Sequence, residues 1–335
     1  MNRFLDIELL DDQAIASLLE TAAALQRDPV SDALRGRVLG LVFMNPSVRT
    51  LASFQAGMAQ LGGSSFVITP GQGSWGFETR GGVVMDGAHA EHVKEGIPVL
   101  AEYADALGVR CFAEGKDLAT DLGEPVLSAI AAASPVPLVN LESAVNHPCQ
   151  ALADWKTLDD LGVPRDGKFV LSWAYHPRPL PLAVPAAVVA MAARRGMDVT
   201  VLRPEGYGLP GQVMETAAQA ASFSGGSVRE TDDRAEAMEG AHIVYAKSWQ
   251  APSVYGEVEA EARLRDGLRG WSVSEEWFGP ARTDARFMHC LPVRRNVVVA
   301  DEILDGARSA VVQQAGNRLH VQKAVLLEML GGRAT

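Results

Sequence analysis

The sequence predicts an α/β protein of two domains, each a parallel sheet flanked by helices. Apolar strand-like runs alternate with helical patterns almost throughout, which is typical of parallel sheets. A chain of 335 residues is long for one core and more naturally forms two. The expected domains are 1–148, joined by a C-terminal helix at 315–335, and 149–314. Ligands of such sheets bind beyond the carboxyl ends of the strands, so we expect an active site in the cleft between the domains.

The strand–helix alternation gives the expected elements in order. In the first half, we expect helices at 11–26, 48–61, 91–105 and 122–132, and strands at 37–43, 65–69, 107–112 and 136–140. A helix at 148–162 carries the boundary. In the second half, we expect strands at 168–174, 198–202, 242–246 and 286–290, and helices at 182–195, 210–222, 301–306 and 317–331. The last helix is too long and amphipathic to be a tail.

Composition narrows the class of protein. The apolar content of 47% and charged content of 21% are those of an ordinary soluble globular protein. No apolar run approaches the ~20 residues of a membrane span, and we expect no signal peptide. Three widely spaced cysteines indicate no disulfide framework and a reducing cytoplasm. A net charge of −11 argues against nucleic-acid binding, so an anionic substrate needs a local cluster of Arg and Lys.

The most informative motif is S-V-R-T at 47–50. The apolar run at 37–44 stops just before it, and a helical pattern starts with Ser47 placed as its cap. A helix N-terminus directs backbone N–H groups and a positive dipole end at an anion, and Arg49 adds a permanently charged fork. A nucleotide P-loop consensus is absent, so the motif favours a phosphate on a small molecule. An ordinary capped helix with a solvated Arg explains this motif, taken alone, equally well.

Two more motifs follow expected strands: H-P-C-Q at 147–150 and H-C-L-P at 289–292, the latter continued by R-R-N. Together with S-V-R-T, in this order and spacing, they resemble the aspartate/ornithine carbamoyltransferase family over essentially the whole chain. The segments WAYHPRPLP (173–181) and YAKSW (245–249) are similar to the N-acylornithine branch. The D-x-x-x-S-M-G loop of ordinary ornithine carbamoyltransferases has no counterpart here.

The resemblance implies transfer of a carbamoyl group from carbamoyl phosphate to an amine. This reaction needs a phosphate clamp, oxyanion donors and a holder for the carbamoyl NH2. The residues implied to bind carbamoyl phosphate are Ser47, Val48, Arg49, Thr50, Trp75, Arg110, His147, Gln150, Cys290, Leu291 and Arg318. Among them, Thr50, Arg110 and His147 are expected to polarise the carbamoyl oxygen. The Gln150 side chain, together with two backbone carbonyls of the H-C-L-P motif, is expected to hold the amide nitrogen.

Neither a cofactor nor a metal is expected. The departing phosphate can take the amine proton, so the reaction requires no dedicated base. The pair His89-x-x-His92 has the look of a metal site but lacks further ligands at a suitable spacing. Taken singly, other residues also have ordinary explanations: Arg110 as a solvated strand end, His147 as a turn residue and Cys290 as core packing.

Trp75 lies in a Gly-rich loop at 70–76, and an exposed Trp is unusual unless it packs on something. The loop could be anchored to its own domain. In the N-acylornithine branch, a Trp here reaches the site of the neighbouring subunit, so the resemblance implies a homotrimer with shared sites.

The second substrate is expected to be an ornithine acylated on its α-nitrogen. The residues implied to recognise it are Glu142, His176, Lys247, Arg294, Ala90 and Arg178. Acetyl-specific members carry Glu at the position of Ala90 and succinyl-specific members carry Pro. Ala removes both charge and bulk, and so permits a succinyl group. Val298 stands where acetyl-type enzymes have Lys.

We therefore favour N-succinylornithine over N-acetylornithine as the substrate, although the segment 317–323 is closer to the acetyl type. Either activity would serve arginine synthesis. Ordinary ornithine carbamoyl transfer and a catalytically silent, anion-binding paralogue are the remaining alternatives.

Overall fold

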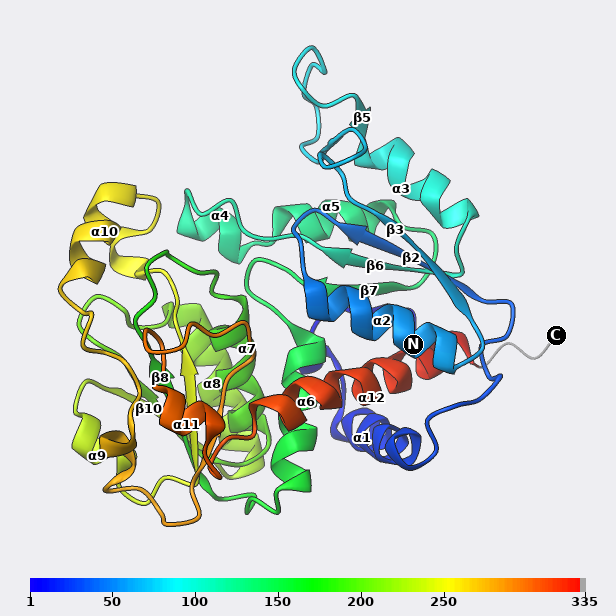
Figure 1. Cartoon of the computed structure of the whole chain (residues 1–335). Coiled ribbons are helices and arrows are strands. Elements are labelled where there is room, and N and C mark those ends of the chain that lie inside the picture. The colour runs from blue at the N-terminus through cyan, green and yellow to red at the C-terminus, as the bar shows by residue number, and fades with distance from the viewer. Residues whose placement is uncertain (332–335) are drawn as a thin grey trace. The chain divides into compact units, whose positions relative to one another are not determined.

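The computed structural model describes residues 1–331 and resolves into two compact units (Figure 1). The first comprises Met1–Glu114, Ala119–Leu152 and the C-terminal segment from Arg318; the second comprises Gly115–Leu118 and Ala153–Asn317. The predicted division lies between 148 and 149, and residues 315–335 are predicted to join the first domain. Residues 332–335 of that expected segment lie outside the described residues.

The first unit contains a five-stranded sheet in the order β1-β7-β6-β2-β3. Every pairing in it is parallel. Its strands are β1 (Arg3–Phe4), β2 (Val38–Phe43), β3 (Ser64–Ile68), β6 (Ala106–Arg110) and β7 (Leu138–Glu142). Its helices are α1 (Asp12–Arg27), α2 (Val48–Gln60), α3 (Val93–Glu102) and α5 (Pro125–Ala133). A small sheet pairs β4 (Phe77–Glu78) with β5 (Glu91–His92).

The second unit contains another five-stranded parallel sheet, in the order β10-β9-β8-β11-β12. Its strands are β8 (Lys168–Trp173), β9 (Asp198–Leu202), β10 (Ser227–Thr231), β11 (Ile243–Lys247) and β12 (Arg286–Met288). Its helices are α7 (Ala183–Arg194), α8 (Gly211–Ser224), α9 (Arg234–Met238), α10 (Val258–Asp266) and α11 (Asp301–Asp305). The expected α/β class with two parallel sheets is confirmed.

Three helices contribute residues to both units. They are α4 (Leu118–Leu122), α6 (Pro148–Asp160) and α12 (Val311–Leu330). The sequence reading began the last helix at 317, six residues late, because Gly316 resembles a helix stop; here it lies inside the helix. The helix expected at 122–132 corresponds to α5, which begins at Pro125 because the chain turns through Glu124 in a left-handed conformation. The short helix α4 before it was not predicted.

Each unit has its own apolar core around its sheet. In the first, Val42, Leu107 and Leu138 from adjacent strands pack with Ile97 and Ile130 from the covering helices. Gly40 in β2 permits close packing, since a Cβ there would lie 2.7 Å from the Leu107 side chain. In the second unit, the corresponding cluster includes Val170, Val244 and Phe287. Because these cores fix the strands, they also fix the side chains at the strand ends.

Strand order places the sequence motifs at a defined point of each sheet. Consecutive strands run outward from β2 to β3 on one side, and the chain then returns to β6 on the other side of β2. In the second unit, β8 leads to β9 and β10 on one side, and β11 then pairs with its other side. Parallel sheets bind ligands outside the carboxyl ends of strands at such switch points. The pairs β2/β6 and β8/β11 are therefore where a site is expected.

Candidate functional site

The N-terminus of α2 follows the carboxyl end of β2 at the switch point of the first unit. Ser47 caps the helix as predicted: its backbone is extended, with φ −157°, and its Oγ accepts from the Thr50 N–H at 3.3 Å. The Thr50 Oγ1 accepts from Ser47 Oγ at 2.9 Å and from Arg318 Nη2 at 2.6 Å. A hydroxyl has two acceptor positions and one proton, so Thr50 holds Arg318 and keeps a proton for a further partner.

Arg110 and Glu142 lie at the carboxyl ends of the adjacent strands β6 and β7. A register shift after Val109 brings them opposite each other. The Arg110 guanidinium and the Glu142 carboxylate form an ion pair, and the same guanidinium lies over the ring of Phe112, 4.4 Å from its centroid. Both charged side chains are largely buried, so each is held in one orientation. Nε of Arg110 has no hydrogen-bond partner among the described residues.

His147 immediately precedes α6, and its backbone carbonyl accepts from the amides of Gln150 and Ala151 in the first turn. Its Nε2 lies 3.5 Å from the Glu142 carboxylate. Burial holds the pKa of His147 well below its usual 6.5, and the positive charges of Arg318, Arg110 and Arg49 lower it further. The imidazole is therefore neutral near pH 7 and can donate a hydrogen bond without carrying charge.

These groups form a positively charged cluster in the first unit. Three guanidinium groups act on one buried imidazole, and the cluster's carboxylate is Glu142. Arg318 is itself 3% exposed, and burial lowers its pKa from the ordinary value. Desolvated cations beside a helix N-terminus are suited to bind an anion. The residues predicted to bind carbamoyl phosphate that lie together here are Ser47, Arg49, Thr50, Arg110, His147 and Arg318. Glu142, which was predicted to bind the acylornithine, lies beside them.

In the second unit, two expected residues meet. His176 follows β8, Arg294 follows β12, and Arg294 Nε donates to His176 Nε2 at 3.1 Å. The other ring nitrogen, Nδ1, lies 3.1 Å from the Arg178 amide nitrogen and 2.9 Å from the Arg178 carbonyl oxygen. Burial lowers the pKa of His176, and so do the positive charges of Arg294 and Lys247. Lys247 ends β11, next to β8 in the sheet, and is 7% exposed.

Other expected residues are positioned differently. Trp75 is 60% exposed, and its indole N–H donates to Glu91 at 2.5 Å within the same chain. Ala90 is exposed in the segment between β4 and β5, which projects from the sheet of its unit (Figure 1). Val48 is exposed at the first turn of α2, whereas Gln150 is buried at the first turn of α6.

The H-C-L-P motif ends the second sheet. Cys290 is buried and Leu291 is half-buried with φ +52°, just before a cis peptide bond to Pro292. Val298 is 2% exposed within the apolar core of this unit. His89 and His92 do not share a site: His92 Nδ1 caps α3 by accepting from Lys94 N–H, and His89 lies 3.5 Å from Glu78.

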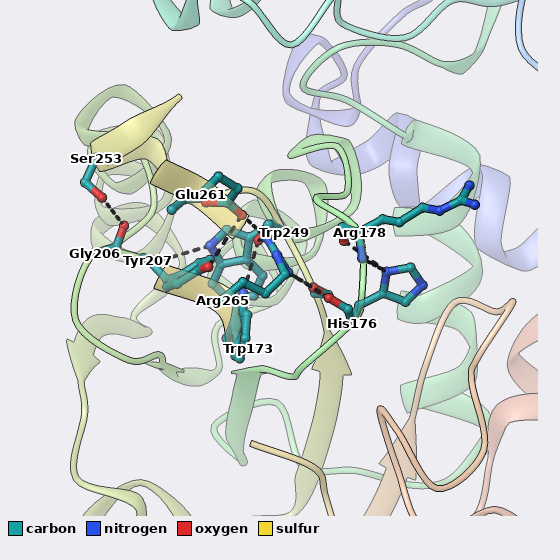
Figure 2. Close-up of polar contacts among 11 residues, drawn as sticks. Trp173, His176, Arg178, Gly206, Tyr207, Trp249, Ser253, Glu261 and Arg265 are labelled. Carbon is teal, nitrogen blue, oxygen red and sulfur yellow. Dashed lines mark hydrogen bonds and ion pairs between the residues drawn. The ribbon is translucent and has the colours of Figure 1, made fainter. Parts of the chain in front are cut away.

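Glu261 and Arg265 in α10 were not predicted from the sequence to belong to the site. They form a buried ion pair, and Arg265 also donates to the backbone of His176 and Trp249 (Figure 2). A pair of opposite charges four residues apart on a helix is ordinarily solvated, so the sequence held no signal for its burial.

Two family models account for most of the chain. The carbamoyl-P binding domain of aspartate/ornithine carbamoyltransferases matches residues 2–160, and the Asp/Orn binding domain of the same family matches residues 184–329. With its two parallel sheets and the basic side chains at their switch points, the chain is an α/β protein of the kind that is suited to anionic ligands. The chain belongs to the aspartate/ornithine carbamoyltransferase family.

Relatives support the expected N-acylornithine branch of that family. The chain is 40% identical over 335 residues to an N-acetylornithine carbamoyltransferase of Xanthomonas campestris pv. campestris, covering 99% of this chain and 98% of the relative. It is 34% identical over 334 residues to an N-succinylornithine carbamoyltransferase of Bacteroides thetaiotaomicron, covering 99% of each.

A similar solved structure is that of an N-acetyl-L-ornithine transcarbamylase in which a glutamate is replaced by alanine, complexed with carbamyl phosphate and N-succinyl-L-norvaline. Its TM-score is 0.95 at 40% identity, covering 98% of this chain and all of that one.

Proposed function

We propose that this protein transfers the carbamoyl group of carbamoyl phosphate to the δ-amine of N-succinyl-L-ornithine, giving N-succinylcitrulline and phosphate in arginine biosynthesis. The observation that carries the proposal is the cluster of Arg49, Arg110, Arg318 and neutral His147 at the switch point of the first sheet. Family membership supports the reaction class, and the positive charge of that cluster supports a phosphate as the leaving group.

In the first unit, the N–H groups and side chains of Ser47, Val48, Arg49 and Thr50 would hold the phosphate, with Arg318. Arg110, His147 and Thr50 would donate to the carbamoyl oxygen as the amine attacks and the tetrahedral oxyanion forms. A neutral His147 suits this role, because it can donate without being a strong acid. Gln150 would hold the carbamoyl NH2, as would the backbone carbonyls of Cys290 and Leu291.

Collapse of the oxyanion breaks the bond from carbon to the phosphate oxygen. The electron pair stays on the departing phosphate, which also takes the amine proton, so the products are a ureido group and phosphate. Each oxyanion donor is expected to lower the barrier by about 2.7–4 kcal/mol, which is why a pre-oriented set can carry the reaction.

For the amine substrate, Glu142 would accept from the amide N–H or the attacking amine. In the second unit, His176, Lys247, Arg294 and Arg178 would recognise the carboxylates. Succinylornithine has two carboxylates and acetylornithine has one, so several cations in this unit suit the former. Ala90 supports the same choice, because it presents neither the charge nor the bulk of the Glu found in acetyl-specific members. The glutamate-to-alanine variant solved with a succinylated ligand is consistent with this reading.

N-acetylornithine is the second candidate, because identity is 40% to the acetyl relative against 34% to the succinyl one. We also propose a homotrimer in which Trp75 contributes to the site of the neighbouring subunit. The exposed indole supports this, since a Trp that is 60% exposed has apolar surface left to bury.

The test is formation of the ureido product from carbamoyl phosphate with succinylornithine, acetylornithine and ornithine in parallel. We expect preference for succinylornithine. Ala90→Glu should depress use of succinylornithine selectively, and Ala90→Gln, which adds similar bulk without charge, separates repulsion from crowding. Equal loss on both acylated substrates would refute the argument from charge and space, and wild-type preference for acetylornithine would overturn the succinyl assignment.

A further inference from the structure

Two chain segments leave the switch point of the second sheet, each next to or containing a residue proposed to bind the acylornithine. One follows β8 and contains His176, and the other follows β11 and begins after Lys247. Neither segment has regular secondary structure beyond its strand, so something else must fix where these side chains lie. A single buried guanidinium, that of Arg265, contacts both segments (Figure 2).

Arg265 lies on α10 and is 3% exposed. Its Nη1 donates to the His176 carbonyl at 3.3 Å and to the Ser248 hydroxyl at 3.1 Å. Its Nη2 donates to the Trp249 carbonyl at 3.2 Å. One planar group therefore ties the segment after β8 to the segment after β11, and Ser248 is the residue next to Lys247.

The pocket around this guanidinium is built to hold it. Glu261, one helical turn earlier, supplies the counter-charge and is 1% exposed. Its other oxygen accepts from the Ala251 N–H at 3.2 Å, which ties the carboxylate to the segment after β11 as well. The rings of Trp173 and Tyr207 lie 5.6 and 5.5 Å from the guanidinium carbon.

The surrounding indoles make the same connection. Trp173, the last residue of β8, donates from Nε1 to the Trp249 carbonyl at 3.1 Å, and Trp249 donates from Nε1 to the Tyr207 carbonyl at 2.9 Å. Both terminal nitrogens of the Arg265 guanidinium are hydrogen-bonded, whereas its Nε has no partner among the described residues. These bonds lie in an apolar surrounding, where hydrogen bonds are strong and unpaired groups are costly.

We propose that Arg265, held by Glu261, is a positioning residue for the acylornithine site, setting the placement of His176 and Lys247. The inference rests on the proposed function, since it takes these two residues as substrate-binding. Only a guanidinium fork reaches both segments and Glu261 at once; the point charge of a lysine cannot.

The test compares three conservative substitutions. Arg265→Lys keeps the charge and removes the fork. Arg263→Lys is the surface control on the same helix, since Arg263 is exposed and pairs with exposed Glu259 at 3.8 Å. Arg195→Lys is the buried control in the same unit; it loses a fork bound to Asp159 and to carbonyls at 163 and 164.

We expect Arg265→Lys to raise KM for the acylated ornithine at least about tenfold, equivalent to about 1.4 kcal/mol. KM for carbamoyl phosphate should stay within about twofold, and both controls should leave both constants unchanged within that limit. If Arg265→Lys does not fold, Glu261→Leu combined with Arg265→Leu removes both charges together, which buried pairs often tolerate, and should show the same selective rise.

Hydrogen exchange on the unliganded protein gives a readout independent of activity. Arg265→Lys should speed exchange of amides in 174–178 and 248–251, and Arg195→Lys should not. Unchanged exchange there, or equal rises in both KM values, would overturn the inference. Failure of the proposed function would look different: the wild-type enzyme would be silent with acylated ornithines, while the exchange experiment would still decide what Arg265 holds.

Discussion

Thr50→Val is the substitution that tests the carbamoyl-phosphate site most directly. Valine keeps the shape of the side chain and removes the hydroxyl that accepts from Ser47 and Arg318. A hydrogen bond to a charged group contributes about 1.5–3 kcal/mol, and loss of an oxyanion donor raises the barrier by about 2.7–4 kcal/mol. We therefore expect kcat/KM for carbamoyl phosphate to fall by a factor of about 10² to 10³, as a barrier increase of that size requires.

Thr50→Ser is the matched control because it keeps the hydroxyl and loses a methyl group. Its kcat/KM should stay within about tenfold of the wild type, since one buried methyl costs far less than a charged hydrogen bond. The assay is ureido-product formation at varied carbamoyl phosphate, with thermal unfolding midpoints recorded for both variants. If Thr50→Val folds and its kcat/KM is close to that of Thr50→Ser, the proposed role of Thr50 is refuted. The hydroxyl would then neither position Arg318 nor stabilise the oxyanion.

Two further predictions concern charge and assembly. The pKa of His147 is depressed in the folded protein, so the unfolded chain binds about one more proton below the ordinary value of 6.5. The contribution of His147 to the free energy of unfolding is therefore fully present above that pH. It should fall as the pH drops below it, by up to about 1.4 kcal/mol per pH unit. Urea unfolding of the wild type and His147→Gln from pH 7.5 to 5 should show the steeper loss in the wild type; parallel curves would contradict it. Mixing inactive Trp75→Ala with inactive Arg110→Ala should restore activity at roughly a quarter of the sites if subunits share them in a closed ring, whereas no recovery after subunit exchange would argue for sites within one chain.

Most of the fold could be predicted from the periodicity of the sequence, and the strands that were missed have identifiable physical causes. The buried strands β2, β8 and β11 are largely apolar runs, as is typical of parallel strands covered on both faces. β10 was missed because it is an edge strand with the sequence SVRET, and none of its residues is fully buried. β1 has only two residues, fixed by pairing with β7, so no local pattern marks it. Tertiary pairing, not propensity, forms both.

The functional residues could be predicted where they lie at the carboxyl ends of strands. The motif after β2 and Arg110 at the end of β6 were found separately in the sequence, and the strand order explains why they share a switch point. The Arg110–Glu142 ion pair depends on a register shift after Val109, which no sequence pattern encodes. The neutral state of His147 likewise depends on burial beside cations that lie far from it in the chain.

Helix α10 shows why the remaining part could not be predicted. It carries two Glu-x-x-x-Arg pairs, Glu259–Arg263 and Glu261–Arg265, offset by two residues and identical in local chemistry. A shift of two positions turns a helical residue by about 200°, so the two pairs point to nearly opposite sides. The first pair is in solvent, where such pairs contribute about 0–1 kcal/mol, and the second is buried, where loss of one partner costs about 3–5 kcal/mol. Which pair is buried depends on Trp173, Tyr207 and Trp249, residues brought to α10 only by the folded sheet. A positioning residue of this kind therefore becomes recognisable only when its burial and its acceptors are known together.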